Sequence, residues 1–88
     1  MNPADKKKLR AETHTLKPVV MIGQSGLTDA VLAEIEQALN SHELIKVKIR
    51  AERDERKQIS EKICADTGAV IIQAIGQIAV IYRLNPDK

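Results

Sequence analysis

The chain has 88 residues, of which 43% are hydrophobic and 30% charged, and its formal net charge is +2. This length predicts a single domain over residues 1–88, with a core from 4 to 84 and a short tail at 85–88. The single cysteine, Cys64, excludes an internal disulfide and a cysteine-based zinc site. Tyr82 is the only aromatic residue, which argues against base stacking on aromatic platforms. With no apolar signal region or membrane-length run, we expect a soluble cytoplasmic protein.

Charge is distributed unevenly along the chain. Residues 1–18 carry five cations and two anions, residues 19–43 carry four anions and no cation, and residues 44–62 carry seven cations and four anions. In a folded domain this layout predicts basic patches from the first and third blocks and an acidic helix from the second. The alternative is that these charges only solvate the surface.

The first half of the chain predicts a helix, a strand and a second helix. Residues 4–14 form a short basic helix anchored by Leu9. Residues 19–22 are apolar without alternation, as expected for a strand covered on both faces. Residues 28–41 form a helix with Thr28 as N-cap. The first helix exposes Lys6, Lys7, Lys8 and Arg10, and the apolar stripe of the second contains Leu27, Val31, Ile35 and Leu39.

The second half predicts a strand, a helix and a hairpin. Residues 44–50 alternate, residues 54–66 form a helix that ends at Gly68, and residues 69–75 and 78–84 are strands. Gly76-Gln77 between them is typical of a type II′ turn. The element order is therefore α-β-α-β-α-β-β. Right-handed crossovers then give a single α/β domain, a four-stranded mixed sheet with the second and third helices packed on it.

A G-x-x-G turn joins the first strand to the second helix. Backbone N–H groups in such a turn, at a helix N-terminus, can bind an anion such as a phosphate. The residues concerned are Gly23, Gln24, Ser25, Gly26, Leu27 and Thr28. The alternative is a plain connection that uses glycine only for a positive φ.

The strand at residues 44–50 separates apolar from basic side chains. Ile45, Val47 and Ile49 should face the helices, because unpaired cations cannot be buried there. Lys46, Lys48 and Arg50 would then be accessible to a phosphate backbone, as would Lys17, Lys7 and Arg10 from the N-terminal region. Arg53, Arg56 and Lys57 extend the positive region. The alternative is a polar face of ion pairs with Glu52, Asp54 and Glu55.

The G-x-x-G turn does not match any of three common enzyme motifs. A dinucleotide fingerprint would need glycine at Ser25, a phosphate-binding Walker loop would need a lysine before Thr28, and a nucleophile elbow would need glycine at Leu27. No acid–base pair stands out either. We therefore expect no enzymatic activity, no metal site and no cofactor.

The sequence resembles the bacterial YhbY proteins, the stand-alone form of the CRM (chloroplast RNA splicing and ribosome maturation) domain. The similarity covers residues 4–84. The segments that carry it are residues 16–23 (LKPVVMIG), 26–28 (GLT), 42–48 (HELIKVK), 67–69 (TGA), 75–76 (IG) and 81–83 (IYR).

This resemblance implies a fold like the C-terminal domain of bacterial translation initiation factor three. It also implies RNA binding through the G-x-x-G loop and the adjoining basic surface, and association with ribosomal RNA in precursors of the large ribosomal subunit, in whose assembly the protein would assist. Relatives often have basic residues where this chain has Gln24 and Gln77. The departure makes binding more dependent on Lys46, Lys48, Arg50 and the N-terminal helix.

A second hypothesis is a protein–protein interaction module of the translation or assembly machinery. Its acidic helix, with Glu34, Glu36 and Glu43, would contact a basic ribosomal protein. Under either hypothesis we expect a monomer, with no contact to a membrane.

Overall fold

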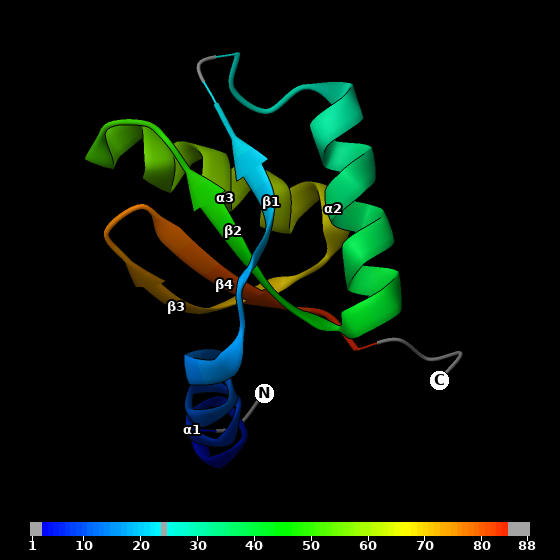
Figure 1. The fold of residues 1–88 in the computed structure, drawn as a ribbon, viewed down its shortest axis with the longest axis vertical. Coiled ribbons are helices and arrows are strands. Elements are labelled where there is room, and N and C mark those ends of the chain that lie inside the picture. Colours follow the sequence, from blue (N-terminus) through cyan, green and yellow to red (C-terminus); the bar gives the residue numbers. More distant parts are fainter. Residues whose placement is uncertain (1–2, 24, 85–88) are drawn as a thin grey trace.

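The computed structural model describes residues 3–23 and 25–84. It contains three α-helices and four strands in the predicted order (Figure 1). None of these helices is long and apolar enough to cross a membrane. The elements are α1 (Pro3–Glu12), the short 3-10 helix η1 (Thr13–Thr15), β1 (Pro18–Ile22), α2 (Asp29–His42), β2 (Leu44–Ile49), α3 (Arg53–Thr67), β3 (Val70–Ile75) and β4 (Ile78–Tyr82).

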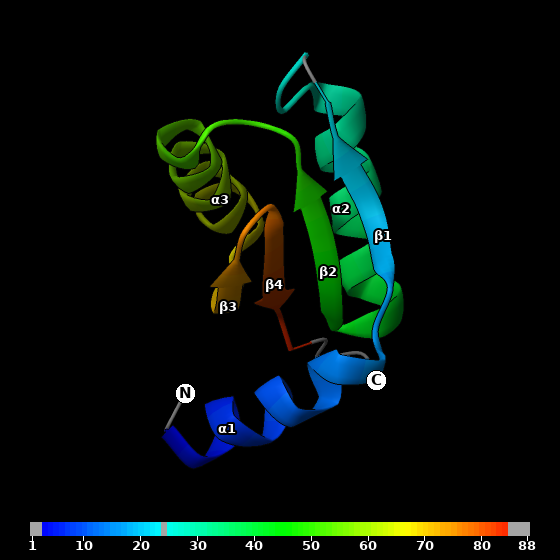
Figure 2. The same ribbon diagram turned by 60° about the vertical axis from the view of Figure 1, so that its left-hand side comes forward.

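The four strands form one mixed sheet in the order β1-β2-β4-β3. β1 and β2 run parallel, and β4 is antiparallel to both β2 and β3. Helices α2 and α3 cover one face of this sheet, and α1 crosses one end of the other face (Figure 2). The predicted fold class is confirmed, and the two faces of the sheet have different environments.

The main core lies between the sheet and helices α2 and α3. The predicted inward residues of β2, Ile45, Val47 and Ile49, are fully buried there. Ile35 of α2 and Ile63 of α3 pack in the same cluster. Burial of an aliphatic side chain of this size contributes about 1.5–3 kcal/mol, so the alternation in β2 orients the strand strongly. Cys64 is half-buried beside this core, and burial raises the pKa of its thiol.

A smaller apolar cluster holds α1 on the second face. Leu44, Ile72 and Val80 are buried, and Leu9 of α1 packs against them, as predicted. Arg10 Nε also donates a hydrogen bond to the carbonyl oxygen of Ile72, 3.3 Å away. These contacts fix α1 at the end of the sheet where β2 begins and β4 ends.

The prediction that β1 is covered on both faces was wrong. Val20 and Ile22 are buried in the main core, but Val19 and Met21, which alternate with them, point to the other face and are exposed. Val19 is 51% exposed and Met21 53%. β1 is an edge strand, and α1 covers only the far end of this face. An unbroken apolar run does not reveal that one of its sides is open.

Local signals set the boundaries of the elements. Thr28 Oγ1 accepts a hydrogen bond from the Val31 amide at 3.2 Å, which confirms the predicted N-cap of α2. Gly68 ends α3 in the left-handed conformation. Gly76 has φ of +55°, whereas φ of Gln77 is not positive. This pattern matches the predicted type II′ turn and excludes type I′, which needs positive φ at both positions.

Candidate nucleic-acid interface

Three chain connections meet at the carboxyl ends of β1 and β2. The Arg50 amide donates to the Ile22 carbonyl at 2.9 Å, and the Ile49 amide donates to the Gln77 carbonyl at 2.7 Å. These bonds tie the end of β2 to the end of β1 on one side and to the β3–β4 turn on the other. Figure 2 shows the loops that follow β1 and β2 at the same end of the sheet. The G-x-x-G loop is therefore a neighbour of Arg50.

The two positions of the G-x-x-G loop differ in whether the backbone requires a glycine. The Gly26 amide donates to the Gly23 carbonyl at 3.1 Å and closes a turn, and Gly26 has φ of +72°. Glycine at 26 is thus explained by the backbone alone. Gly23 has no positive φ, and a Cβ added there would meet nothing within 4 Å. Neither conformation nor internal packing requires glycine at 23.

Some polar groups of the loop are already engaged within the chain, which narrows the anion-binding prediction for residues 23–28. The Gly26 N–H is engaged within the turn, and Thr28 Oγ1 is engaged in the cap of α2. The Leu27 side chain packs against the core, so only its backbone could contribute. Ser25 is exposed at the tip. Gln24 lies outside the described residues.

The basic side chains of β2 lie on the face away from the main core. Lys46 and Lys48 are half-buried, and Arg50 is exposed just beyond the end of the strand. In the part of the chain that the structure describes, no ion pair joins these three side chains to Glu52, Asp54 or Glu55. The alternative of an ion-paired polar face is therefore not observed. These cations remain available for an external anion.

The remaining predicted site residues lie toward the opposite end of the sheet. Lys17 and Lys46 line a shallow hollow together with Glu12. Lys7 is exposed on α1, and Arg10 is partly committed to its bond with β3. The predicted residues thus extend along the whole length of β2, about 16 Å at 3.3 Å per residue, instead of forming one patch.

A groove of about 880 Å³ lies between α3 and the β3–β4 hairpin. Arg53 and Lys57 line it, but Asp54 and Glu61 do too, so its charge is mixed. Arg56 Nη1 donates to the Ala51 carbonyl at 2.7 Å and orders the connection before α3. The Gly76-Gln77 turn lies at one side of the groove. Gln77 was noted only as a position where relatives are often basic, and neither residue was among the predicted site residues. The position of the turn follows from the pairing of β4 with β2, which no local pattern in the sequence encodes.

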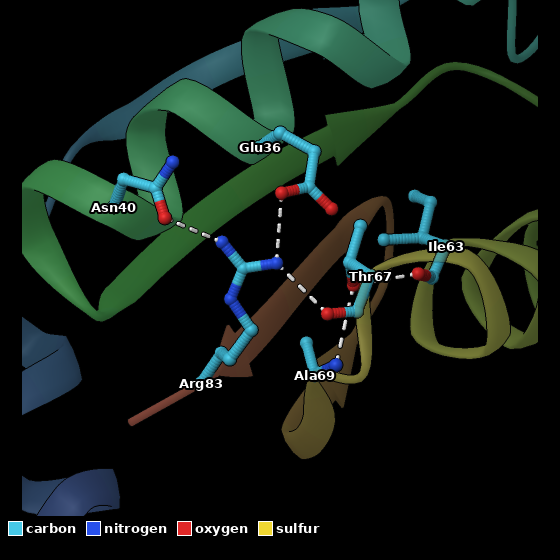
Figure 3. A network of polar contacts seen from close by, with 6 residues as sticks. All are labelled: Glu36, Asn40, Ile63, Thr67, Ala69 and Arg83. Atoms are coloured by element: carbon cyan, nitrogen blue, oxygen red, sulfur yellow. Dashed lines mark hydrogen bonds and ion pairs between the residues drawn. The ribbon is translucent and has the colours of Figure 1, made fainter. Parts of the chain in front are cut away.

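Arg83 forms a polar network at the other end of the molecule (Figure 3). Its Nη1 donates to Glu36 Oε2 at 2.9 Å and to the Thr67 carbonyl at 2.8 Å, and its Nη2 donates to Asn40 Oδ1 at 2.8 Å. The side chain is only 20% exposed. One guanidinium therefore joins the end of β4 to α2 and to the end of α3.

The network changes the interpretation of the acidic helix. Glu36 was predicted to be one of the residues that contact a basic partner, but its carboxylate is engaged with Arg83. The Glu43 carbonyl accepts a hydrogen bond from the Arg83 amide at 2.9 Å, so the backbone at this end of α2 is also fixed. Glu34 is exposed. The acidic surface for a protein partner is smaller than the sequence suggests.

Residues 1–83 match the family model of the CRS1 / YhbY (CRM) domain. The chain belongs to this family. The resemblance based on short segments of the sequence is therefore confirmed over almost the whole length of the chain.

Relatives agree with this assignment. A Pseudomonas aeruginosa protein named a probable RNA-binding protein is 49% identical over 92% of this chain and 79% of its own length. A Haemophilus influenzae protein named an RNA-binding protein is also 49% identical, over 99% of this chain and 89% of its own length. A solution structure of a Staphylococcus aureus protein, described as a candidate RNA-binding protein, superposes with a TM-score of 0.84 at 30% identity. The superposition covers 97% of this chain and 90% of the Staphylococcus aureus chain.

Proposed function

We propose that this protein binds RNA, with a phosphate backbone lying across the carboxyl ends of β1 and β2. The observation that carries the proposal is the placement of Lys48 and Arg50 beside the G-x-x-G loop, without an ion pair to the neighbouring acidic side chains. Membership of the CRM family and the names of the relatives support the same function.

The proposed mechanism is binding and not catalysis. Lys46, Lys48 and Arg50 neutralise phosphates and release their counterions, which makes the affinity depend on salt. At Gly23 the absence of a side chain lets the RNA backbone approach the loop closely. Amides of the loop other than that of Gly26 then donate to a phosphate oxygen.

We further propose that the RNA is ribosomal RNA in precursors of the large ribosomal subunit, and that the protein assists assembly in the cytoplasm. The support for this finer function is the resemblance to the YhbY proteins. Co-sedimentation of the tagged protein with large-subunit precursors, and not with mature subunits, tests it. Equal association with both would contradict the assembly role and leave RNA binding intact.

A salt titration of RNA binding tests the interface. In Lys46→Ala/Lys48→Ala the slope of log affinity against log salt should fall by about 1.4–1.8, because each neutralised phosphate contributes about 0.7–0.9. Lys62→Ala is the matched control, since Lys62 is an exposed lysine on α3 that pairs with Asp66 at 3.6 Å. The control should keep the wild-type slope. An equal slope in all three proteins would contradict the assignment of RNA to β2.

A further inference from the structure

One row of side chains crosses the whole sheet on the face away from the main core. Met21 of β1 pairs with Lys48 of β2, Lys48 pairs with Ile78 of β4, and Ile78 pairs with Ile75 of β3. Residues directly opposite each other on neighbouring strands project to the same side of a sheet. Three aliphatic side chains and one lysine therefore form a continuous line, which we call the open row.

The open row is not covered by α1. That helix contacts the same face at its other end, where Leu44, Ile72 and Val80 are buried. Ile75 is 63% exposed and Met21 is 53% exposed, whereas Ile78 and Lys48 between them are half-buried. Single exposed aliphatic side chains need no explanation. Two exposed apolar side chains in register with a half-buried isoleucine and a lysine form an apolar surface with a charge at its centre.

The chemistry of the row restricts its occupant. Lys48 favours an anionic group at the centre of the row, and the apolar side chains beside it favour apolar surface next to that anion. Unpaired RNA provides both within one nucleotide, because its bases can be splayed out of the stack, each with its own phosphate nearby. A duplex offers phosphates and sugars but keeps its base faces stacked inside. The charge and the apolar flanks together favour unpaired nucleotides.

The position of the row is continuous with the proposed phosphate site. Met21 is two residues before Gly23, and Lys48 is two residues before Arg50. The row spans three strand spacings, about 14 Å in total. An RNA strand held at the G-x-x-G loop would therefore reach it without leaving the protein surface.

We infer that the open row binds unpaired nucleotides of the RNA, with Met21, Ile78 and Ile75 against base faces and Lys48 against a phosphate. This inference rests on the proposed function and names the kind of RNA that the site selects. It is compatible with the sequence-based expectation that bases do not stack on aromatic platforms, because Tyr82 is the only aromatic residue. Aliphatic side chains provide the apolar contact instead.

The variant Met21→Thr/Ile75→Thr tests the inference, because threonine suits a strand and removes apolar length. The probes are a short RNA without self-complementarity and the same sequence in a duplex. We expect about a tenfold loss of affinity for the unpaired RNA, which corresponds to about 1.4 kcal/mol. Affinity for the duplex should change by less than about twofold. The salt slope should stay at the wild-type value, because no phosphate contact is removed.

Val70→Thr is the matched control. Val70 is also an exposed aliphatic residue of β3, but it pairs with Tyr82 at the other end of the sheet. The Val70→Thr variant should bind both RNAs with the affinity of the wild type. Thermal melts of all three proteins show whether each is folded under the binding conditions.

The outcomes separate this inference from the proposed function. If the wild type binds RNA with a slope that depends on Lys46 and Lys48, but Met21→Thr/Ile75→Thr retains full affinity for the unpaired probe, the open row does not contact RNA. A wild-type preference for the duplex would overturn the inference as well. If the wild type binds neither probe at low salt, the proposed function itself fails.

Discussion

Arg83 and the two basic residues at the opposite end of the sheet, Lys48 and Arg50, differ in whether the chain itself supplies acceptors for their charge. Arg83 is mostly buried and donates to three oxygen acceptors from two helices. Lys48 and Arg50 lie at the other end, and among residues 3–23 and 25–84 no ion pair joins them to the acidic residues that follow them. A positive charge in this domain therefore indicates binding only where its own chain supplies no acceptor. Net charge alone does not distinguish the two cases.

Removal of Arg83 should have the largest effect on stability. Arg83→Ala should lower the free energy of unfolding by about 2–3 kcal/mol. The substitution removes the three hydrogen bonds that the guanidinium donates and leaves the Glu36 carboxylate without its ion-pair partner. The melting temperature should fall by roughly 10 °C or more for a domain of this size. Thermal and urea unfolding measure both quantities.

RNA binding is the second readout for the Arg83 variant. Below its melting temperature, Arg83→Ala should bind RNA with the wild-type affinity and salt slope. Arg83→Lys keeps the charge but loses the planar fork of donors, so it should also be destabilised. A reduced salt slope in either variant would mean that Arg83 contacts phosphate, and the contrast between the two ends would then disappear.

A carboxylate placed in the G-x-x-G loop should mainly lower RNA affinity, whereas removal of Arg83 should mainly lower stability. Gly26→Asp has open space for its side chain, and Asp tolerates the left-handed conformation better than most residues. We expect a loss of about 1 kcal/mol in stability from the positive φ. RNA affinity should fall about tenfold because the carboxylate repels a phosphate. Gly26→Asn, which has the same shape without the charge, should keep most of the affinity. Equal losses in both variants would indicate a backbone effect and not repulsion.

The smallest expected effect is at Gly23. Gly23→Ala should leave stability unchanged or raise it by about 0.4–1 kcal/mol, because φ there is not positive and the added Cβ meets nothing. Affinity for RNA should nevertheless fall a few-fold if the RNA backbone approaches this position closely. Calorimetric unfolding measures the stability of the variant, and a binding isotherm on the same preparation measures its affinity for RNA. Full affinity in Gly23→Ala would show that this glycine has no role in binding.

Periodicity explains which parts of the fold could be predicted. The alternation of Ile45, Val47 and Ile49 with lysines allows only one orientation of β2, and the structure has it. Thr28, Gly68 and Gly76 likewise encode a cap, a helix end and a turn within a few residues. Val19 and Met21 lack such a contrast, so the open side of β1 could not be distinguished from a buried one.

Long-range contacts explain what could not be predicted. Arg83 meets Glu36 across 47 residues of sequence and the Thr67 carbonyl across 16, and neither contact leaves a local pattern. The same holds for the open row, whose members come from four strands. Lys46 and Lys48 were placed correctly on the accessible face. Their separation from Lys7 and Arg10 depends on where α1 docks, which only the structure shows.

Mapping the RNA contact by NMR tests the central claim most directly. Backbone amide shifts of the wild-type protein would be followed during titration with a short unpaired RNA at low salt. We predict that the largest changes fall at residues 21–28, 46–50 and 75–78, and that Glu36, Asn40 and Arg83 hardly change. Changes centred on the Arg83 network, or on the groove beside α3 with the loop unaffected, would contradict the account.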